Sequence, residues 1–188
     1  MTDSPMPAIR RLASVSEQQI AQLGELLIDC VAGGAPVTFM HPVSPAKAGS
    51  FWRGVAAGVA SGSRALLVAE DESGVVGTVM LVLDLPENQP HRAEIAKMLV
   101  HTRARRRGLG TALMRAAEAT ARECGRTLVV LDTATGSDAE RLYARLGWQR
   151  VGEIPGFSLR PHGGMTATTY FYRELPAAAG GGGGGEAT

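Results

Sequence analysis

The run Arg105-Arg106-Arg107-Gly108-Leu109-Gly110-Thr111 contains the residues whose types and spacing say most about chemistry. It lies between the apolar run 95–100 and a helical pattern that begins at Thr111. Two glycines two positions apart let the backbone turn tightly, and a helix start offers unpaired N–H groups at the positive end of its dipole. Three arginines add charged groups that suit phosphate oxygens. The turn is therefore predicted to hold a polyphosphate.

Other phosphate-binding sequences can be compared with this turn. A P-loop requires Gly-x4-Gly-Lys-Ser/Thr, and a dinucleotide-binding turn requires G-x-G-x-x-G with an acidic residue about 20 positions later. The turn has neither pattern and reads Arg-x-x-Gly-x-Gly. On these residues alone, a glycine turn flanked by solvated arginines is an equal alternative to a phosphate site.

The elements that must position this turn follow from hydrophobic periodicity. Apolar residues at helical spacing behind Ser16 and Ser137, each with Gln or Glu three positions later, predict two capped helices. Two Val- and Leu-rich runs joined by residues 71–74 predict an antiparallel hairpin. The whole order predicts a mixed α/β domain with a central sheet. The expected strands are 8–12, 64–70, 75–85, 92–100, 127–133, 148–154 and 165–175, and the expected helices are 16–33, 46–60, 108–124 and 137–146.

Size and composition set the class of protein. The chain has 188 residues, 45% hydrophobic content and a net charge of +1, which fit one globular domain, 1–175, with a flexible Ala/Gly-rich tail, 176–188. Clustered arginines without interleaved aromatics argue against nucleic-acid binding. Cys30 and Cys124 lack metal-ligand spacing, so buried thiols and no metal are expected. No leader-like or long apolar segment is found, which favours a cytoplasmic location and no membrane partner.

Two motifs resemble the GNAT superfamily of acetyltransferases. The Arg-x-x-Gly-x-Gly turn is similar to the loop that holds the pyrophosphate of acetyl-coenzyme A (acetyl-CoA), and segment 139–148 is similar to the second signature, in which a tyrosine on a short helix faces the thioester. The resemblance implies a mixed α+β fold: a mostly antiparallel sheet with a splayed parallel strand pair and helices on both faces. Within the superfamily, the tabtoxin resistance acetyltransferases are the most similar over 9–175, through segments 33–35, 39–40, 92–94, 131–133, 136–137 and 152–156.

The resemblance also implies a set of coenzyme-binding residues. Main-chain groups of Leu99 and Val100 would pair with the pantetheine arm, the turn would hold the pyrophosphate, and Arg103 or Arg106 would reach the ribose phosphate. The chain departs from many relatives at Thr102, where a proline is common, and at Ser137, near a common asparagine. The expected acetyl-CoA-binding set is Leu99, Val100, Arg105, Arg106, Arg107, Gly108, Leu109, Gly110, Thr111 and Ser137.

Acetyl transfer needs a proton acceptor for the acceptor group and a proton donor for the departing thiolate. The resemblance makes Tyr143 the candidate general acid, since a phenol with a pKa of about 10 can reprotonate a thiolate with a pKa of about 8.5. Core packing is its alternative role. Glu94 and Asp132, on neighbouring strands, are the candidate general bases, with solvent exposure and loop capping as alternatives. His101 is more typical of a cap than of a base.

The acceptor is expected beneath apolar walls with a few polar groups, namely Phe39, Met40, His41, Trp52 and Phe157, although each could equally be a core residue. The predicted activity is direct acetyl transfer from acetyl-CoA to an amine or hydroxyl of a small, polar, amino-acid-like metabolite or toxin. A non-catalytic acyl-CoA sensor and a protein N-acetyltransferase are the alternatives. Edge strands at the C-terminal end could also pair in a homodimer.

Overall fold

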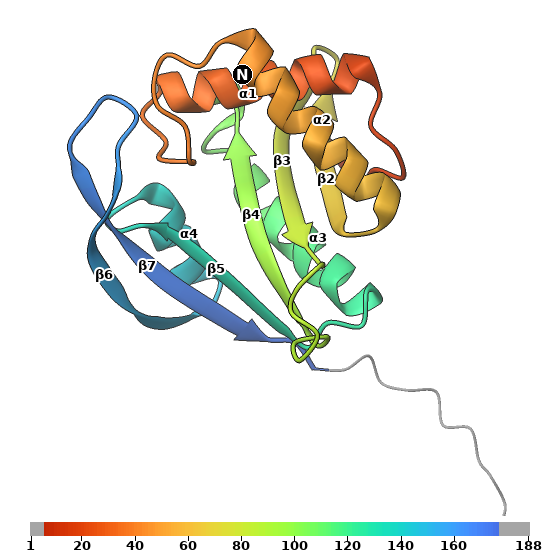
Figure 1. The fold of residues 1–188 in the computed structure, drawn as a ribbon, viewed down its shortest axis with the longest axis vertical. Coiled ribbons are helices and arrows are strands. Elements are labelled where there is room, and N and C mark those ends of the chain that lie inside the picture. Colours follow the sequence, from red (N-terminus) through yellow and green to blue (C-terminus); the bar gives the residue numbers. More distant parts are fainter. Residues whose placement is uncertain (1–5, 177–188) are drawn as a thin grey trace, which may run out of the picture.

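Seven strands form one sheet in the order β1-β2-β3-β4-β5-β7-β6, with helices on both faces (Figure 1). The structure, a computed structural model, describes residues 6–176, so the predicted tail lies outside the described residues from 177 onward. The strands are β1 Ala8–Arg11, β2 Arg64–Asp71, β3 Gly74–Val82, β4 Arg92–Val100, β5 Leu128–Ala134, β6 Gln149–Leu159 and β7 Met165–Glu174. The helices are α1 Glu17–Ala32, α2 Pro45–Ser61, α3 Leu109–Glu123 and α4 Asp138–Arg145, with a 3₁₀ turn, η1, at Thr102–Ala104.

Strands β4 and β5 form the parallel pair of this sheet, and the other neighbouring strands are antiparallel. Their register covers three residue pairs, from Arg92↔Leu128 to Glu94↔Val130. Beyond these pairs, β4 continues to Val100 and β5 to Ala134 while the two strands separate (Figure 1). We call this unpaired stretch the divergence. It confirms the predicted GNAT fold, with its mostly antiparallel sheet and its splayed parallel pair.

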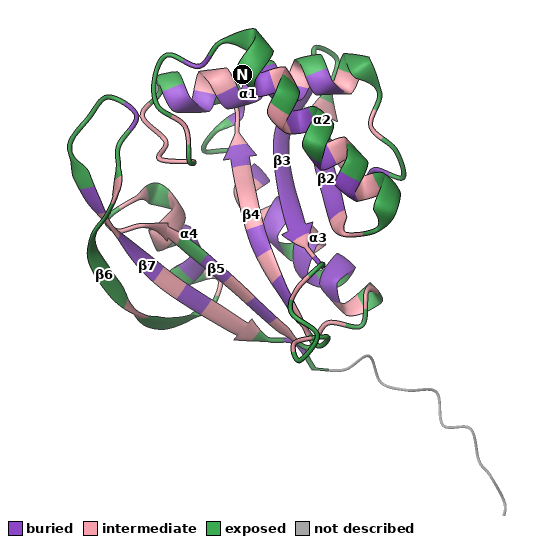
Figure 2. Cartoon of the chain, in the orientation of Figure 1, coloured by how far each residue is buried: buried purple, intermediate pink, exposed green. Residues whose placement is uncertain are grey.

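Two apolar cores lie on opposite faces of the sheet, because side chains alternate along each strand. One face of β2 places Leu66 and Val68 against α1 and α2, and the other places Leu67 against α3. Strands β2 and β3 are therefore buried on both sides, whereas β4 is partly exposed and much of β6 is exposed (Figure 2). Burying one leucine side chain completely stabilises the folded state by about 1.5–3 kcal/mol relative to leaving it exposed. The two cores fix which face each polar side chain of β4 and β5 can reach.

The C-terminal hairpin differs most from the sequence expectation. The strand predicted over 148–154 runs from Gln149 to Leu159, because the glycine-proline segment after Ile154 is taken up as a register shift rather than a loop. As the edge strand, β6 exposes apolar side chains such as Val151 and Leu159. A homodimer through this edge stays a prediction.

Candidate active site

The arginine-rich turn joins η1 to α3. Arg106 and Gly108 both have positive φ, 61° and 81°, so the chain reverses sharply before the helix. Gly108 is the N-cap residue and provides no side-chain cap, and the first helical bond runs from the Ala112 N–H to the Gly108 carbonyl (3.1 Å). The amides of residues 109–111 therefore have no partner within their own helix. Uncapped amides at a helix start are a site for an anion such as a phosphate.

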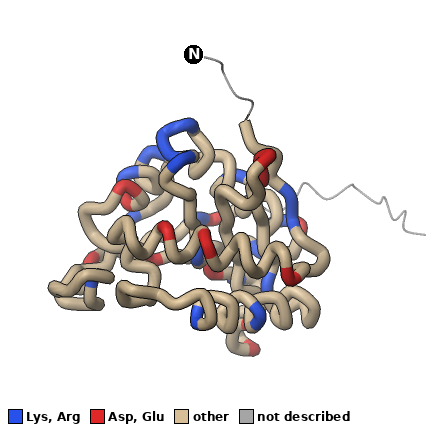
Figure 3. Tube along the Cα trace, turned by 90° about the horizontal axis from the view of Figure 1, so that it is seen from above, with Lys and Arg blue, Asp and Glu red and all other residues tan. Residues whose placement is uncertain are grey.

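Two of the arginines near this turn are held by other groups. Arg105 donates from Nε to the Val100 carbonyl (3.0 Å), at the end of β4. Arg103 pairs with Asp71 (2.6 Å). Figure 3 shows the longest continuous basic stretch of the chain in one protruding loop, which corresponds to the consecutive residues 105–107. The predicted phosphate contacts of the turn, through its main-chain amides and its arginines, stay a prediction.

Helix α1 holds η1, the segment that precedes the turn. The Asp29 carboxylate accepts hydrogen bonds from the Thr102 amide (2.9 Å) and from its hydroxyl (2.8 Å). His101 caps η1, because its Nδ1 accepts from the Arg103 amide (3.3 Å), and this is the role that the sequence favoured over that of a base. A carboxylate near the C-terminal end of a helix is disfavoured by the helix dipole. The two hydrogen bonds that Asp29 accepts from Thr102 offset this effect.

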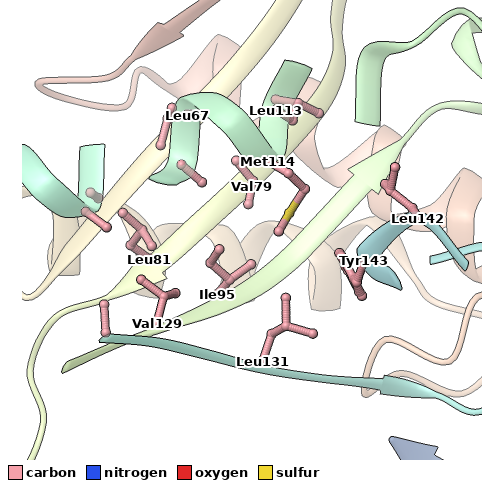
Figure 4. Close-up of a cluster of buried hydrophobic side chains, with 14 of the residues drawn as sticks. Leu67, Val79, Leu81, Ile95, Leu113, Met114, Val129, Leu131, Leu142 and Tyr143 are labelled. Carbon is pink, nitrogen blue, oxygen red and sulfur yellow. The ribbon is translucent and has the colours of Figure 1, made fainter. Parts of the chain in front are cut away.

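Helix α4 brings the predicted general acid to the same face. Tyr143 is 4% exposed and contacts the rings of Trp148 (centroids 6.2 Å apart) and Phe171 (6.0 Å). Figure 4 shows it beside Leu131 of β5, within the core that α3 covers. Burial, and to a smaller extent the charge of Asp132, raises the pKa of the Tyr143 phenol well above its usual value. A phenol is already protonated at neutral pH at its usual pKa of about 10, and the upward shift makes Tyr143 a weaker acid than a free phenol.

Leu142, the other buried residue of α4, lies next to Gly110 of the turn. A Cβ atom at Gly110 would lie 3.1 Å from Cδ2 of Leu142, the residue before Tyr143. The N-cap, Ser137, accepts from the Glu140 amide (3.1 Å) and lies 3.3 Å from the Thr133 hydroxyl. Its hydroxyl thus caps α4, and the predicted coenzyme contact of Ser137 remains a prediction. Leu99 and Leu109 are both 2% exposed, so their side chains belong to the cores and their predicted main-chain contacts with the coenzyme stay a prediction.

Glu94 and Asp132 lie on the opposite face of the sheet. Their neighbours Ala93 and Leu131 point into the core beneath α3, so alternation directs both carboxylates toward the side of α1 and α2. Glu94 accepts from Arg92 (2.8 Å), and Asp132 accepts from the Thr168 hydroxyl (3.1 Å). The structure therefore brings the two predicted bases to one face, at the point where β4 and β5 separate.

Tyr170 belongs to this group although its sequence position gave no signal. It is the β7 partner of Asp132 in the sheet register. Its pKa is raised by burial first and then by the charges of Asp132 and Glu94, so the phenol lies within the field of both carboxylates. The pairing of β5 with β7 could not be read from spacing along the chain, and Tyr170 was missed for that reason.

Two loops meet over this carboxylate face. The His41 amide donates to the Pro161 carbonyl (3.0 Å), and the rings of His41 and His162 lie 4.6 Å apart. The loop after α1 and the β6–β7 loop are therefore in contact. Phe157 approaches Tyr170 edge-on with centroids 6.2 Å apart, and Met40 is exposed.

Trp52 does not fit its expected place among the acceptor walls. Its side chain is 0% exposed and belongs to the core between α1, α2 and the sheet, so it cannot touch an acceptor. The neighbouring Phe51 is partly exposed instead and lies edge-on to Phe39 (centroids 5.3 Å apart). One position of helical rotation separates the two residues, and sequence spacing alone did not decide between them.

The site therefore has two sides. The turn, the start of α3 and Tyr143 share one face of the sheet, whereas Glu94, Asp132 and Tyr170 share the other. The charge of Asp132 contributes, after burial, to the raised pKa of both Tyr143 and Tyr170. No backbone pairing joins β4 to β5 in the divergence.

Solved structures with this architecture are acetyltransferases. The chain superposes on yncA of Salmonella typhimurium, assigned as an acetyltransferase and solved with acetyl-CoA, with a TM-score of 0.74, 21% identity and coverage of 95% of this chain and 99% of that one. A phosphinothricin acetyltransferase from Sinorhizobium meliloti, in complex with acetyl-CoA, gives 0.72, 18%, 90% and 88%. A ribosomal-protein-alanine N-acetyltransferase from Brucella melitensis gives 0.74, 21%, 89% and 99%. At these identities the likeness shows a shared fold.

The sequence itself gives the family. The profile of the acetyltransferase (GNAT) family matches residues 37–148, which is more than half of the chain. The chain therefore belongs to the GNAT acetyltransferase family, whose members take the acetyl group from acetyl-CoA. An 88-residue stretch is 36% identical to N-acetyltransferase 8 of Homo sapiens and covers 46% of this chain and 39% of that protein. The chain thus matches about two fifths of the length of this curated relative.

Two surveys of the described residues bear on other functions. Within 6–176, no helix is both long and apolar enough to cross a bilayer. The same residues contain no group of three or more His, Cys, Asp or Glu side chains placed to hold a metal ion.

Proposed function

We propose that the chain catalyses direct acetyl transfer from acetyl-CoA to the amine or hydroxyl of a small, polar, amino-acid-like molecule. The observation that carries this proposal is the placement of anion-binding amides and a protonated phenol on one face of the divergence and of two carboxylates on the other. The first face supplies the coenzyme site and the proton donor, and the second face supplies the proton acceptor, all of which acetyl transfer needs.

The residues divide the reaction as follows. The amides of 109–111, with Arg106 and Arg107, hold the pyrophosphate, and main-chain groups of Leu99 and Val100 hold the pantetheine arm. The acceptor nitrogen or oxygen forms a bond to the acetyl carbon while the carbon–sulfur bond breaks. The acceptor proton passes to Glu94 or Asp132, directly or through water, and the thiolate takes its proton from Tyr143.

A small acceptor is supported by the contact between the two loops over the carboxylate face. The hydrogen bond from His41 to Pro161 and the contact between the tilted rings of His41 and His162 join the two loops on that side, which leaves less room for an extended peptide. Phe39 and Phe157 remain as apolar walls. This contact disfavours a protein N-acetyltransferase, even though one relative of this fold acts on a ribosomal protein.

The finer acceptor class is an amino-acid-like toxin. It rests on the resemblance to the tabtoxin resistance acetyltransferases and on the shared fold of a phosphinothricin acetyltransferase. A non-catalytic acyl-CoA sensor would need neither the carboxylates nor a protonated Tyr143.

The test is thiol release from acetyl-CoA by the purified full chain. Its acceptor panel contains amines, L-amino acids, amino-acid-like toxins and N-terminal peptides. Release with a small acceptor is expected. Acetylation of peptides alone would replace the proposal by protein acetylation, and calorimetric binding of acetyl-CoA without release to any acceptor would favour a sensor.

A further inference from the structure

Lys97 has an unusual backbone and an unusual position. It lies in the middle of β4 with φ of 51°, a conformation that costs a non-glycine residue on the order of 1 kcal/mol. The register with β3 shifts at this point, since Thr78 pairs with Leu99 and Met80 pairs with Ala96. Lys97 and Met98 together therefore face the single residue Val79, which defines a β-bulge.

The bulge changes the face to which Lys97 points. In a regular strand, Lys97 would follow Ala93 and Ile95 into the core beneath α3. Its ammonium instead lies 5.5 Å from the ring centroid of Phe51, on α2. The bulge thus transfers Lys97 to the face that holds Glu94 and Asp132.

The ammonium is half-buried there. Burial lowers the pKa of Lys97, while the charge of Asp132 opposes this shift and Arg64 adds to it. The Asp132 carboxylate is within electrostatic range but is hydrogen-bonded to Thr168. Among residues 6–176, the contact with Phe51 is the one close partner of the Lys97 ammonium that the structure shows. A partly desolvated cation gains most from an anion brought to it.

The chain uses lysine sparingly. Lys47 and Lys97 are its two lysines among 19 basic residues. Lys47 also lies over a ring of the same aromatic pair, 5.7 Å from the centroid of Phe39, but it is exposed and belongs to the first turn of α2. Both lysines therefore lie over an aromatic ring. Lys47 is exposed and lies on α2, whereas Lys97 is half-buried and lies on β4, one of the two strands of the divergence.

We propose that Lys97 binds a carboxylate of the acceptor, so that the acceptor is a zwitterionic amino acid whose amino group faces Glu94 and Asp132. An amino acid carries one carboxylate and one ammonium. Lys97, beside Phe51, would pair with the carboxylate, and Glu94 and Asp132 on the same face would pair with the ammonium. This inference rests on the proposed function and makes its acceptor specific: an amine without a neighbouring carboxylate would be a poor substrate.

The experiment compares L-amino acids with their carboxamides, which keep the amine and lose the carboxylate. Wild-type protein should show kcat/KM values about 10- to 100-fold higher for the acids, mainly through KM. Lys97→Met should abolish this preference by weakening use of the acids and leaving the amides nearly unchanged. Lys97→Asn, which tolerates positive φ, is the second neutral variant if the methionine variant is poorly folded. Lys47→Met should keep the wild-type preference.

Several outcomes would overturn the inference. Equal use of acids and amides by the wild type, or an unchanged preference in both Lys97 variants, removes the carboxylate contact. A fall in kcat of equal size for acids and amides assigns Lys97 to the chemistry instead. Calorimetric titration of the same acid–amide pairs gives a readout without turnover: tighter binding of the acids by the wild type, lost in Lys97→Met, upholds the contact even if thiol release fails, and equal binding refutes it.

Discussion

The donor side and the acceptor side of this molecule are built in different ways. The proposed donor side consists of η1, the turn and the start of α3, which are continuous in sequence and present main-chain amides without a side-chain cap. The acceptor side collects side chains from β4, β5, β7, α2 and two distant loops. A binding site made of backbone tolerates many side chains, whereas a site made of side chains changes with each of them. This difference explains why one fold can keep its donor and vary its acceptor.

Loss of the phenol at the point where both sides meet should have the largest effect. Tyr143→Phe keeps the ring contacts with Trp148 and Phe171 and removes the proton donor. We expect kcat to fall by about 1,000-fold, within the range for general acid catalysis, with the acetyl-CoA dissociation constant nearly unchanged. Steady-state kinetics measures kcat, and calorimetry measures the acetyl-CoA dissociation constant. Tyr172→Phe, which removes a phenol from β7 instead of α4, is the control. Unchanged turnover in Tyr143→Phe would assign that residue to packing alone.

The carboxylates test the acceptor side by itself. We expect Glu94→Gln or Asp132→Asn to lower kcat by about 100-fold, because the acceptor proton then has no base. The variant that removes the true base should also remove the acidic limb of the kcat pH profile, whereas the other should keep it. Acetyl-CoA binding should be unaffected in both, and a loss of coenzyme affinity would show that the two sides are not separable.

The arginines test the donor side by itself. Arg106→Gln should raise the KM for acetyl-CoA by about 5- to 10-fold and leave kcat and acceptor preference unchanged, since it removes one charge-assisted phosphate contact. The effect should shrink as salt is raised from low to physiological concentration. Arg145→Gln, on α4, is a matched loss of charge that is expected to change nothing.

The smallest effect concerns the support of the turn. Arg103 lowers the pKa of Asp71 to about 2, so the folded carboxylate binds its proton less tightly than the unfolded one, whose pKa is about 3.9. The resulting stability is present above about pH 4 and is lost as the pH falls toward 2. After allowance for solvent screening of a partly exposed pair, Arg103→Gln should cost about 1 kcal/mol at pH 6. Urea unfolding should show this difference at pH 6 and a smaller one at pH 3.

The sequence was most informative where structure depends on local spacing. The helix caps at Ser16 and Ser137, the order of strands and the glycine turn all follow from residues within a few positions of each other. The Ser137 cap is an instructive half-match, because Glu140 binds the Gly136 amide and the Thr169 hydroxyl rather than closing the predicted box. Local rules gave the helix start, and tertiary contacts decided the rest.

The acceptor side was harder to predict because it depends on register and helical rotation. Tyr170 reaches Asp132 through the pairing of β5 with β7, and Lys97 reaches Phe51 through a bulge that no local pattern signals. Trp52, expected at the acceptor, lies in the core, and Phe51, one step of rotation away in α2, is the partly exposed ring. Arg105, expected over a phosphate, holds the end of β4 because Val100 presents its carbonyl there.

The absence of a side chain at Gly110 has a mechanical consequence. Because a Cβ atom at this position would lie 3.1 Å from Cδ2 of Leu142, the start of α3 packs closely against α4, which carries Tyr143. A side chain larger than hydrogen at position 110 should therefore push the two helices apart. In the proposed mechanism, this would change the spacing between the pyrophosphate site and the Tyr143 hydroxyl.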